Sequence, residues 1–444
     1  MNFVSGTKLG TALVLCALGI PCAAQIRDPG VRGGSGAGAP LPGADPSYFA
    51  EALAAFRETH SITGSLEPAS GLGPRFNGTS CGGCHAQPAA GGSSPPRNPQ
   101  LAMATAHGAR NKIPSFVAPD GPVRVARHKL KPDRTRDGAL AQLFTVSGRS
   151  DAGNCVVAPP DFRNLDSLSF RIPTPTFGAG LIETIPDDAI RENQGAQMQT
   201  KQELGILGRP NVNLDRAIGR FGWKAQHASL LHFAGEAYQL EMGVPNDVFY
   251  TQPESLPEIC LSLYDAPYDD PTNYTESYSG RLEAPVYLFT NFMRLLDQPK
   301  PVSSFPGASA ESIVNGRQLF GRVGCALCHT PTLLTGRFSA LPAMNHAGVH
   351  LYSDLLLHHM GPKLADDIVQ GTAGPDEFRT APLWGLGQRV FFLHDGRTSD
   401  LLVAIQEHKS SGNGFVSEAN TVVDHFHALS AAEQRDVLNF LRSL

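Results

Sequence analysis

The chain has 444 residues, more than one ordinary hydrophobic core needs, so two or three domains are expected. Hydrophobic residues make up 41% and charged residues 17%, as in globular proteins, while 46 glycines and 35 prolines favour long irregular connections. The formal charge of -5 provides no basic field to attract nucleic acid, so we exclude that class of partner.

The first 24 residues have the pattern of a cleavable secretory leader. Lys8 precedes an apolar run from Leu9 to Ile20, and small residues lie three and one positions before an expected cut after Ala24. The run is about 12 residues long, whereas a membrane span needs roughly 20, so we favour cleavage over a membrane anchor. No later segment is apolar enough to span a bilayer, and we expect a soluble, periplasmic protein in an oxidising compartment.

Four helices are predicted along the chain. After residues 25–44, a Gly/Pro/Ala-rich segment that we expect to be a flexible linker, a helix begins with Asp45 as its cap and Pro46 in its first turn. A second lies near "AQHASLLHFAGEAYQLEM", and a third in "SAESIVNGRQLFGRV" leads into a cysteine motif. The last begins at Ser430, which forms a capping box with Glu433.

Two CxxCH units dominate the cysteine pattern. Of eight cysteines, Cys16 and Cys22 leave with the leader, and four others lie in "CGGCH" and "CALCH". A redox dithiol, or a zinc site built from both pairs, gives no reason for a histidine directly after each second cysteine. Covalent haem attachment uses every residue, because two thioethers tie the macrocycle and the adjacent imidazole becomes the proximal iron ligand. We therefore predict two covalently bound haem c groups, held by Cys81, Cys84, His85, Cys325, Cys328 and His329.

Cys155 and Cys260 are the remaining cysteines. In an oxidising compartment an even remainder favours a disulfide between them. A catalytic thiol is the weaker interpretation, because nothing near either residue indicates a lowered thiol pKa.

The spacing of the two CxxCH units predicts the overall organisation. They lie 244 residues apart, from Cys81 to Cys325, which is far more than one small haem module needs. We predict a mainly α fold with two cytochrome c-like haem modules, at residues 45–300 and 301–444. The first would carry a large, loop-rich insertion with short strands. Phe320 precedes Cys325 by five residues as Phe76 precedes Cys81, a spacing that the two modules share.

Six segments of the chain resemble a known family. From Gly71 almost to the C-terminus, they resemble di-haem c-type oxidoreductases described as peroxidases or thiol oxidoreductases. The last segment also resembles the C-terminal module of bacterial di-haem cytochrome c peroxidases and of a related enzyme that matures a tryptophan-derived cofactor. The segments are "GLGPRFNGTSCGGCH", "RIPTPTFGAGLIETIP", "RFGWKAQ", "GCALCHTPTL", "YSDLLLHHMG" and "FRTAPLWGLGQRVFFLHDGRTSDLLVAIQEH".

The resemblance implies a distal ligand for the second haem. In the peroxidases this ligand, usually methionine and sometimes tyrosine, lies on the helix after the HDG turn, and counting from His394 gives His408 here. His408 also follows Ile405 by three residues, on the apolar face of the expected helix. A core or helix-terminal histidine is the competing interpretation, with Met360 as the reserve ligand. Because Met/His ligation raises a haem potential, a haem held by His329 and His408 should have a lower one.

By the same resemblance, the haem on His85 meets the substrate. Peroxide reduction needs an open iron position and a base that moves a proton between the two oxygens. Glu183 in "FGAGLIETIP" is the candidate base, and an ordinary surface carboxylate is the alternative. His107 and His128 are within chain reach of this haem, although each fits a solvent-exposed histidine better.

Three more residues are candidates for the haem sites. Trp223 in "RFGWKAQ" is a candidate electron bridge between the haems, or else a buried aromatic with a paired indole N–H. Arg397 is a candidate partner for a haem propionate, or else part of a surface salt bridge. His358 in "LLLHHMG" is expected to contact a propionate rather than iron. The resemblance also implies a possible calcium ion between the modules, for which we name no ligands.

Together these features predict an exported di-haem c-type cytochrome that acts as an oxidoreductase, with peroxide reduction as the leading reaction. Electrons would enter from a small redox protein or another donor at the His329 haem and pass to the His85 haem, where a small oxidant such as hydrogen peroxide binds. A non-catalytic electron carrier is one alternative, although it has little use for an insertion of roughly 200 residues. A haem-dependent oxygenase is the other, although such relatives are longer.

Overall fold

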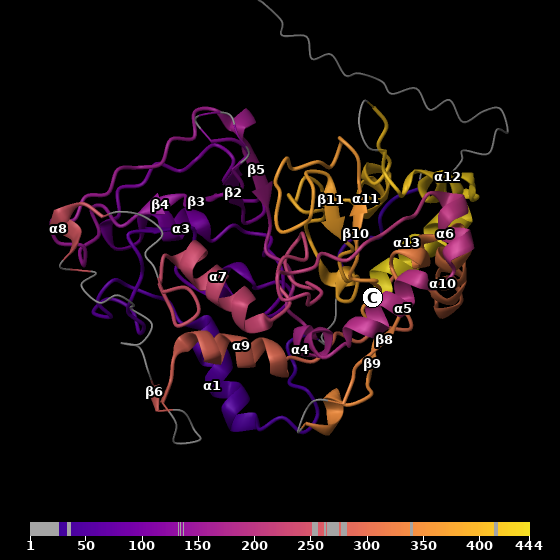
Figure 1. The fold of residues 1–444 in the computed structure, drawn as a ribbon, viewed down its shortest axis with the longest axis horizontal. Helices are drawn as coiled ribbons and strands as arrows, with labels where there is room; N and C mark the ends of the chain where they lie inside the picture. The colour runs from indigo at the N-terminus through magenta and orange to yellow at the C-terminus, as the bar shows by residue number, and fades with distance from the viewer. Residues whose placement is uncertain are drawn as a thin grey trace, which may run out of the picture.

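The computed structural model describes residues 26–32, 37–131, 133, 135, 137–250, 256–261, 263, 275–276, 282–337, 341–412 and 416–444. The predicted leader at residues 1–24 lies outside the described residues. Within them the chain forms thirteen α-helices and eleven short strands, joined by long connections (Figure 1). None of the described helices is long and apolar enough to cross a membrane.

The helices occur in both halves of the chain. The four predicted helices are all present, each within a few residues of its expected start. Their bounds are α1 Pro46–Arg57, α2 Cys81–Cys84, α3 Gln100–Thr105, α4 Ala179–Glu183, α5 Asp187–Gly195, α6 Met198–Leu204, α7 Leu230–Met242, α8 Glu258–Leu261, α9 Pro285–Leu295, α10 Ala310–Val323, α11 Leu401–Glu407, α12 Asn420–Ala428 and α13 Ala431–Ser443.

The strands form five small antiparallel sheets among the described residues. The largest has the order β3-β2-β5, and the others are the pairs β1-β4, β6-β7, β8-β9 and β10-β11. Short strands between long loops agree with the predicted insertion, while the mainly α class and the two-module division stay predictions. The bounds are β1 Arg75–Phe76, β2 Val125–His128, β3 Leu140–Ala141, β4 Phe144–Thr145, β5 Leu168–Arg171, β6 Thr275–Glu276, β7 Leu282–Glu283, β8 Leu333–Leu334, β9 Gly348–Val349, β10 Leu357–His359 and β11 Glu377–Arg379.

In the N-terminal half, α1, α7 and α9 pack together around a core of aromatic side chains (Figure 1). The carboxylate of Asp45 caps α1 by accepting hydrogen bonds from the backbone N–H groups of residues 47 and 48, as predicted. Phe56 of α1 packs against Phe292 of α9, with ring centroids 4.6 Å apart. Tyr238 of α7 meets Phe289 of α9 edge-on at 5.0 Å. These contacts fix the helices that surround the first CxxCH unit.

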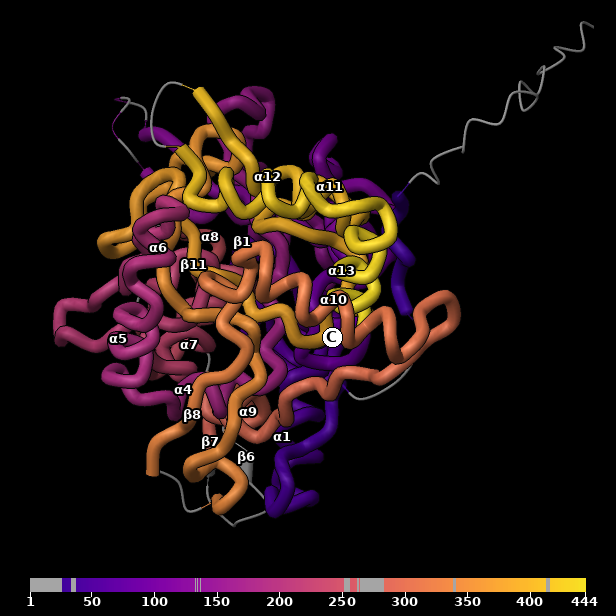
Figure 2. The backbone as a smooth tube through the Cα atoms, turned by 90° about the vertical axis from the view of Figure 1, so that its right-hand side faces the viewer, coloured from indigo at the N-terminus to yellow at the C-terminus, as the bar shows by residue number. Residues whose placement is uncertain are grey.

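In the C-terminal half, α10 packs closely along α13 (Figure 2). A Cβ at Gly316 of α10 would lie 1.9 Å from the carbonyl oxygen of Asp436 in α13, so only glycine allows this approach. The predicted capping box of Ser430 and Glu433 begins α13. Phe320 and Phe440 meet in the core between the two helices, with ring centroids 5.4 Å apart. The packed pair holds the second CxxCH unit at the end of α10.

Residues 187–210 lie against the C-terminal half, where α5 contacts β8 and Leu204 of α6 packs with Val422 of α12 (Figure 1). The side-chain amide of Asn193 donates to the hydroxyl of Thr330 at 3.1 Å. The backbone N–H of Leu207 donates to the carboxylate of Glu418 at 2.9 Å. These contacts join residues on either side of the boundary predicted at residue 300.

The segment predicted as a flexible linker is bound to the rest of the protein where it is described. Asp28 accepts a hydrogen bond from Nε of Arg442 at 2.7 Å, and the backbone N–H of Arg32 donates to the carbonyl of Gly387 at 2.9 Å. Leu41 is buried and its N–H donates to the carbonyl of Leu295. Arg442 is fully buried, and a buried guanidinium without its carboxylate is strongly destabilising. Composition predicted mobility here because it carries no information about this distant partner.

Candidate functional site

The first CxxCH unit lines a cavity, which we call the His85 cavity. Cys81, Cys84 and His85 form one wall at α2. The other walls come from α7, α9, β2, β5 and the segment that contains Trp223. His85 is the only histidine among the described residues that line this cavity.

His85 is held by the backbone. Its Nδ1 lies 3.0 Å from the carbonyl oxygen of Gly92, and the backbone of Thr174 is a second hydrogen-bond partner of the ring. Phe56 packs edge-on against the ring, with centroids 6.1 Å apart. Burial lowers the pKa of His85, which favours the neutral imidazole. A neutral imidazole positioned by a backbone carbonyl is the usual form of a metal-binding histidine.

The second CxxCH unit lines a separate cavity, which we call the His329 cavity. Because the two cysteine pairs line different cavities, they cannot share one zinc ion, and that alternative is excluded. The walls include α11, α12, α13, β10 and β11. Four histidines line this cavity, namely His329, His358, His394 and His408.

His329 and His408 are held in the same way as His85. Nδ1 of His329 lies 3.0 Å from the carbonyl oxygen of Tyr352, and Nδ1 of His408 lies 2.7 Å from that of Ala404. Burial, and then the nearby His408, lower the pKa of His329 to about 4. Burial also lowers the pKa of His408. Two neutral imidazoles therefore line one cavity with a ring nitrogen free on each.

A phenylalanine packs against the histidine of each CxxCH unit, but the two phenylalanines do not have the same spacing from the unit. Phe320 of α10 lies 6.3 Å from His329, ring centroid to ring centroid. The residue in the matching position beside His85 is Phe56, in α1. Phe76 instead packs on Phe144 across the β1-β4 pair. The helix before the motif supplies the ring in both places, and a longer loop follows α1 than follows α10.

The four motif cysteines are free thiols. Burial raises the pKa of Cys81 and of Cys325 to about 12, and it raises the pKa of Cys84 as well. Thiols held in the protonated form are poor nucleophiles, which disfavours a redox dithiol at either motif. Their position on the cavity walls suits attachment to a group inside.

Trp223 lines both cavities. Its indole N–H donates to the carbonyl of Ile172 at 3.0 Å, so its polar atom is paired as expected of a buried tryptophan. His394 meets the indole edge-on at 6.4 Å, and Phe378 stacks on His394 at 4.5 Å, both distances between ring centroids. These aromatic rings thus contact one another in a row at the partition between the two cavities.

A protein-family model described as "Di-haem oxidoreductase, putative peroxidase" matches residues 161–444. This chain belongs to the di-haem oxidoreductase family. The match contains the second CxxCH unit, Trp223 and His408, while the first CxxCH unit precedes it. A comparison with curated proteins finds no significant match.

Two solved structures are similar to this di-haem oxidoreductase at low identity. A MauG-like protein associated with microbial copper homeostasis is 15% identical, with a TM-score of 0.30 over 59% of this chain and 89% of that chain. Hydrazine synthase of Kuenenia stuttgartiensis is 14% identical, with a TM-score of 0.26 over 48% of this chain and 60% of that chain. At these TM-scores neither likeness establishes a shared fold.

The residues of this di-haem oxidoreductase fit haem groups in both cavities. Arg379 and Arg389 are buried in the wall of the His329 cavity, and burial lowers the pKa of each to about 10. Their described hydrogen bonds go to backbone carbonyls and none to a carboxylate. In the His85 cavity, Nε of Arg127 is buried without a partner. Each cavity thus has buried positive charge that haem propionates would balance.

Glu183, the predicted base, does not line the His85 cavity. Its carboxylate accepts a hydrogen bond from Nε of Arg294 at 2.7 Å and another from the backbone N–H of Leu230 at 2.8 Å. The second bond caps the first turn of α7. Glu183 therefore joins α4, α7 and α9, and the structure gives it a structural role in place of the predicted catalytic one.

Arg397, the predicted propionate partner, lies outside the His329 cavity. Its guanidinium pairs with Asp395 at 2.8 Å and with Glu407 at 3.4 Å, in a partly exposed cluster. Arg397 therefore fits the alternative interpretation, a surface salt bridge.

The buried Arg379 and Arg389 were not predicted from the sequence, because β11 and the loop after it carry no pattern that marks them as cavity residues.

The remaining histidine predictions have mixed outcomes. His107 pairs with Glu67 at 2.6 Å and lines neither cavity, and His128 also lines neither. His358 lines the His329 cavity with Met360, but its two ring nitrogens face Asp354 and Glu418 at 2.9 and 2.7 Å. No nitrogen is left for a propionate, which corrects that expectation.

Calcium stays a prediction. Among the described residues, one group brings three metal-ligand atoms within 4.8 Å of one another, and it consists of Cys328, Asp354 and His358. Its sulfur and nitrogen atoms do not suit calcium, which takes oxygen ligands. The predicted disulfide between Cys155 and Cys260, in contrast, is confirmed.

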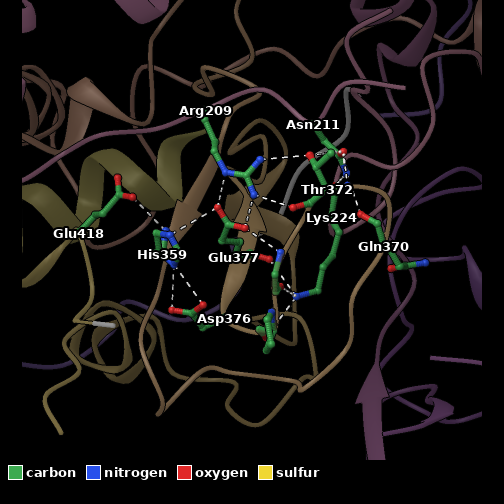
Figure 3. A network of polar contacts seen from close by, with 11 residues as sticks. Arg209, Asn211, Lys224, His359, Gln370, Thr372, Asp376, Glu377 and Glu418 are labelled. Atoms are coloured by element: carbon green, nitrogen blue, oxygen red, sulfur yellow. Dashed lines mark hydrogen bonds and ion pairs between the residues drawn. The ribbon is translucent and has the colours of Figure 1, made fainter. Parts of the chain in front are cut away.

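A network of polar contacts around Lys224 includes Asn211 and Glu377 (Figure 3). Lys224, next to Trp223, is fully buried and pairs with Asp366 at 2.8 Å. Asp366 also pairs with Arg171, which lines the His85 cavity. Three carbonyls of the loop and strand around β11 accept from the Lys224 ammonium. Because leaving either charge unpaired would be costly, the network holds the indole in place.

Proposed function

We propose that this chain is an exported, periplasmic di-haem c-type oxidoreductase that reduces hydrogen peroxide. The observation that carries the proposal is the difference between the two cavities. Two backbone-held imidazoles line the His329 cavity, whereas His85 is the only described imidazole in the other. The family match supports a redox function for the chain as a whole. The difference supports one closed and one open iron position.

The haem-holding residues follow from the cavity walls. Cys81, Cys84 and His85 would hold one haem, and Cys325, Cys328 and His329 the other, with His408 as a further histidine that would bind its iron. When bound, haem supplies an iron that accepts and donates single electrons and can bind a peroxide oxygen. Arg379 and Arg389 would orient the propionates of the second haem.

Trp223 supports electron transfer between the two sites. It lines both cavities, and the hydrogen bond to the Ile172 carbonyl fixes the plane of its ring. Electrons from a small redox protein would enter at the His329 cavity. They would pass along this partition to the His85 cavity, where the substrate binds.

Two measurements test the proposal against a pure electron carrier and a haem-dependent oxygenase. Electron paramagnetic resonance on the haem-loaded protein should show a high-spin signal that changes with peroxide. Two low-spin signals that do not respond would support the carrier. Steady-state consumption of a reduced donor with peroxide should exceed oxygen uptake with organic substrates, and the reverse would support the oxygenase.

A further inference from the structure

Glu236 and His227 form a hydrogen-bonded pair at the wall of the His85 cavity. Nε2 of His227 lies 2.7 Å from Oε2 of Glu236. Glu236 lies on α7 and lines the cavity, whereas His227 precedes α7 and is not among the residues that line it. The side chains of His227 and Glu236 are 12% and 26% exposed, so both are partly buried. The pair therefore links the cavity lining to a residue outside it.

The local structure holds His227 in this position. Its carbonyl accepts a hydrogen bond from the N–H of Arg220 at 2.8 Å, and its own N–H donates to the carbonyl of Phe221 at 3.4 Å. Phe233 packs edge-on against the imidazole, with ring centroids 6.0 Å apart. Because both the backbone and the ring of His227 are fixed, its imidazole can hydrogen-bond to the Glu236 carboxylate without a large loss of side-chain entropy.

Several charged or polar groups face the Glu236 carboxylate. Burial raises its pKa, but His227, Arg127 and Gln226 lower it, and the net pKa lies below the ordinary value. Arg171 and Glu241 also feel the charge of Glu236. At neutral pH the carboxylate is thus ionised and able to accept a proton from a ligand in the cavity.

We infer that Glu236 is the catalytic proton-transfer group of the His85 cavity and that His227 is the positioning residue that exchanges its protons with the outside. The inference rests on the proposed function. One hydrogen peroxide, two electrons from a reduced donor protein and two protons give two waters. Glu236 takes the proton from the oxygen that stays bound and returns it to the other oxygen, which leaves as water when the O–O bond breaks. Two protons, which enter through His227, and the two electrons from the donor protein then convert the remaining oxygen to the second water.

The test compares variants of this pair with variants of a matched pair elsewhere. E236Q should lower the peroxide kcat by about 10²- to 10⁴-fold, the usual contribution of a general acid–base group. E236D, which keeps a carboxylate, should retain more activity than E236Q. His107 and Glu67 form a similar pair, 2.6 Å apart, that lines neither cavity. H107Q and E67Q should leave turnover unchanged, and every variant should contain two haems per chain.

H227Q tests the positioning role through pH. Because His227 helps to lower the pKa of Glu236, its loss should move the acidic limb of the kcat/KM profile to higher pH. Infrared pH-difference spectra of the resting protein, without peroxide, provide a readout apart from turnover. A carboxylate signal should be missing in E236Q and should titrate at higher pH in H227Q.

The outcomes separate the inference from the proposed function. Wild-type turnover that survives in E236Q within twofold overturns the role of Glu236 and leaves peroxide reduction standing. An infrared titration that H227Q does not move overturns the positioning role. If the haem-loaded wild type does not turn over peroxide at all, the proposed function fails and this inference fails with it.

Discussion

The two cavities are alike at the wall that would anchor haem and different in the rest of their lining. In each, a helix end supplies the CxxCH unit, a carbonyl holds the histidine Nδ1, and a phenylalanine packs on the ring. The rest of the lining includes His408 in the His329 cavity, and charged side chains and two methionines in the His85 cavity. Similar anchors are thus combined with different surroundings, and under the proposed function this difference separates the electron-storing site from the reacting one.

Replacing His408 should have the largest effect on the haem spectra, because it removes the second backbone-held histidine that distinguishes the His329 cavity from the His85 cavity. H408A should convert the second haem from low spin to high spin, so electron paramagnetic resonance would show two high-spin haems per chain. H408M should keep it low spin and raise its midpoint potential by a fraction of the roughly 0.8 V that axial ligands span. An H408A spectrum identical to wild type would exclude His408 as the ligand and favour Met360.

Replacing Trp223 should slow transfer between the cavities without changing either haem spectrum. W223F loses the hydrogen bond to Ile172 and the larger ring, and we expect peroxide turnover to fall about tenfold, equal to roughly 1.4 kcal/mol in the barrier. W384F is the matched control, since Trp384 is buried in the core and lines neither cavity. Equal effects of the two changes would indicate a packing defect and no electron bridge.

Removing a buried positive charge should change only the second haem. R389Q should lower the midpoint potential of the second haem. The oxidised haem carries one more positive charge than the reduced haem, so removing a nearby positive charge stabilises the oxidised form relative to the reduced one. The expected shift is tens of millivolts, given that 1.4 kcal/mol corresponds to about 59 mV for one electron. R397Q is the control, since Arg397 pairs with carboxylates outside the cavity. A larger shift for R397Q in a redox titration would return the propionate role to it.

The smallest effect is expected at the methionines of the His85 cavity. Met242 lies 4.0 Å from the Cys81 sulfur, measured between the sulfur atoms, and Met293 lies on α9. M293L and M242L should leave the spin state of the first haem unchanged in the optical spectrum at room temperature. A low-spin wild type that becomes high spin in M293L would show a closed first site and contradict the proposed function.

The sequence predicted the features whose signals are local. The CxxCH units, the Asp45 cap and the capping box at Ser430 each depend on residues within one or two turns, and the structure contains each helix that they mark. His408 was implied by the resemblance, by its position after the HDG turn, and its spacing on one helix supported that choice.

The failures concern side chains whose partners are far along the chain. Glu183 is committed to Arg294, 111 residues later, and no local pattern shows this. Phe76 and Phe320 share a spacing before their CxxCH units, yet the ring that packs on His85 is Phe56, from the helix before the unit. Glu236 has only a histidine nine residues earlier as a signal, a separation that neither helix nor strand periodicity explains.

The ion pair between Asp28 and Arg442 has a consequence for how the molecule is made. Asp28 is synthesised 414 residues before its partner, so for most of translation its carboxylate has no counter-ion. The contact can form only when α13 has emerged and packed on α10. The earliest described segment is thus among the last to settle, and its docking onto a finished C-terminal half closes almost the whole polypeptide into one loop.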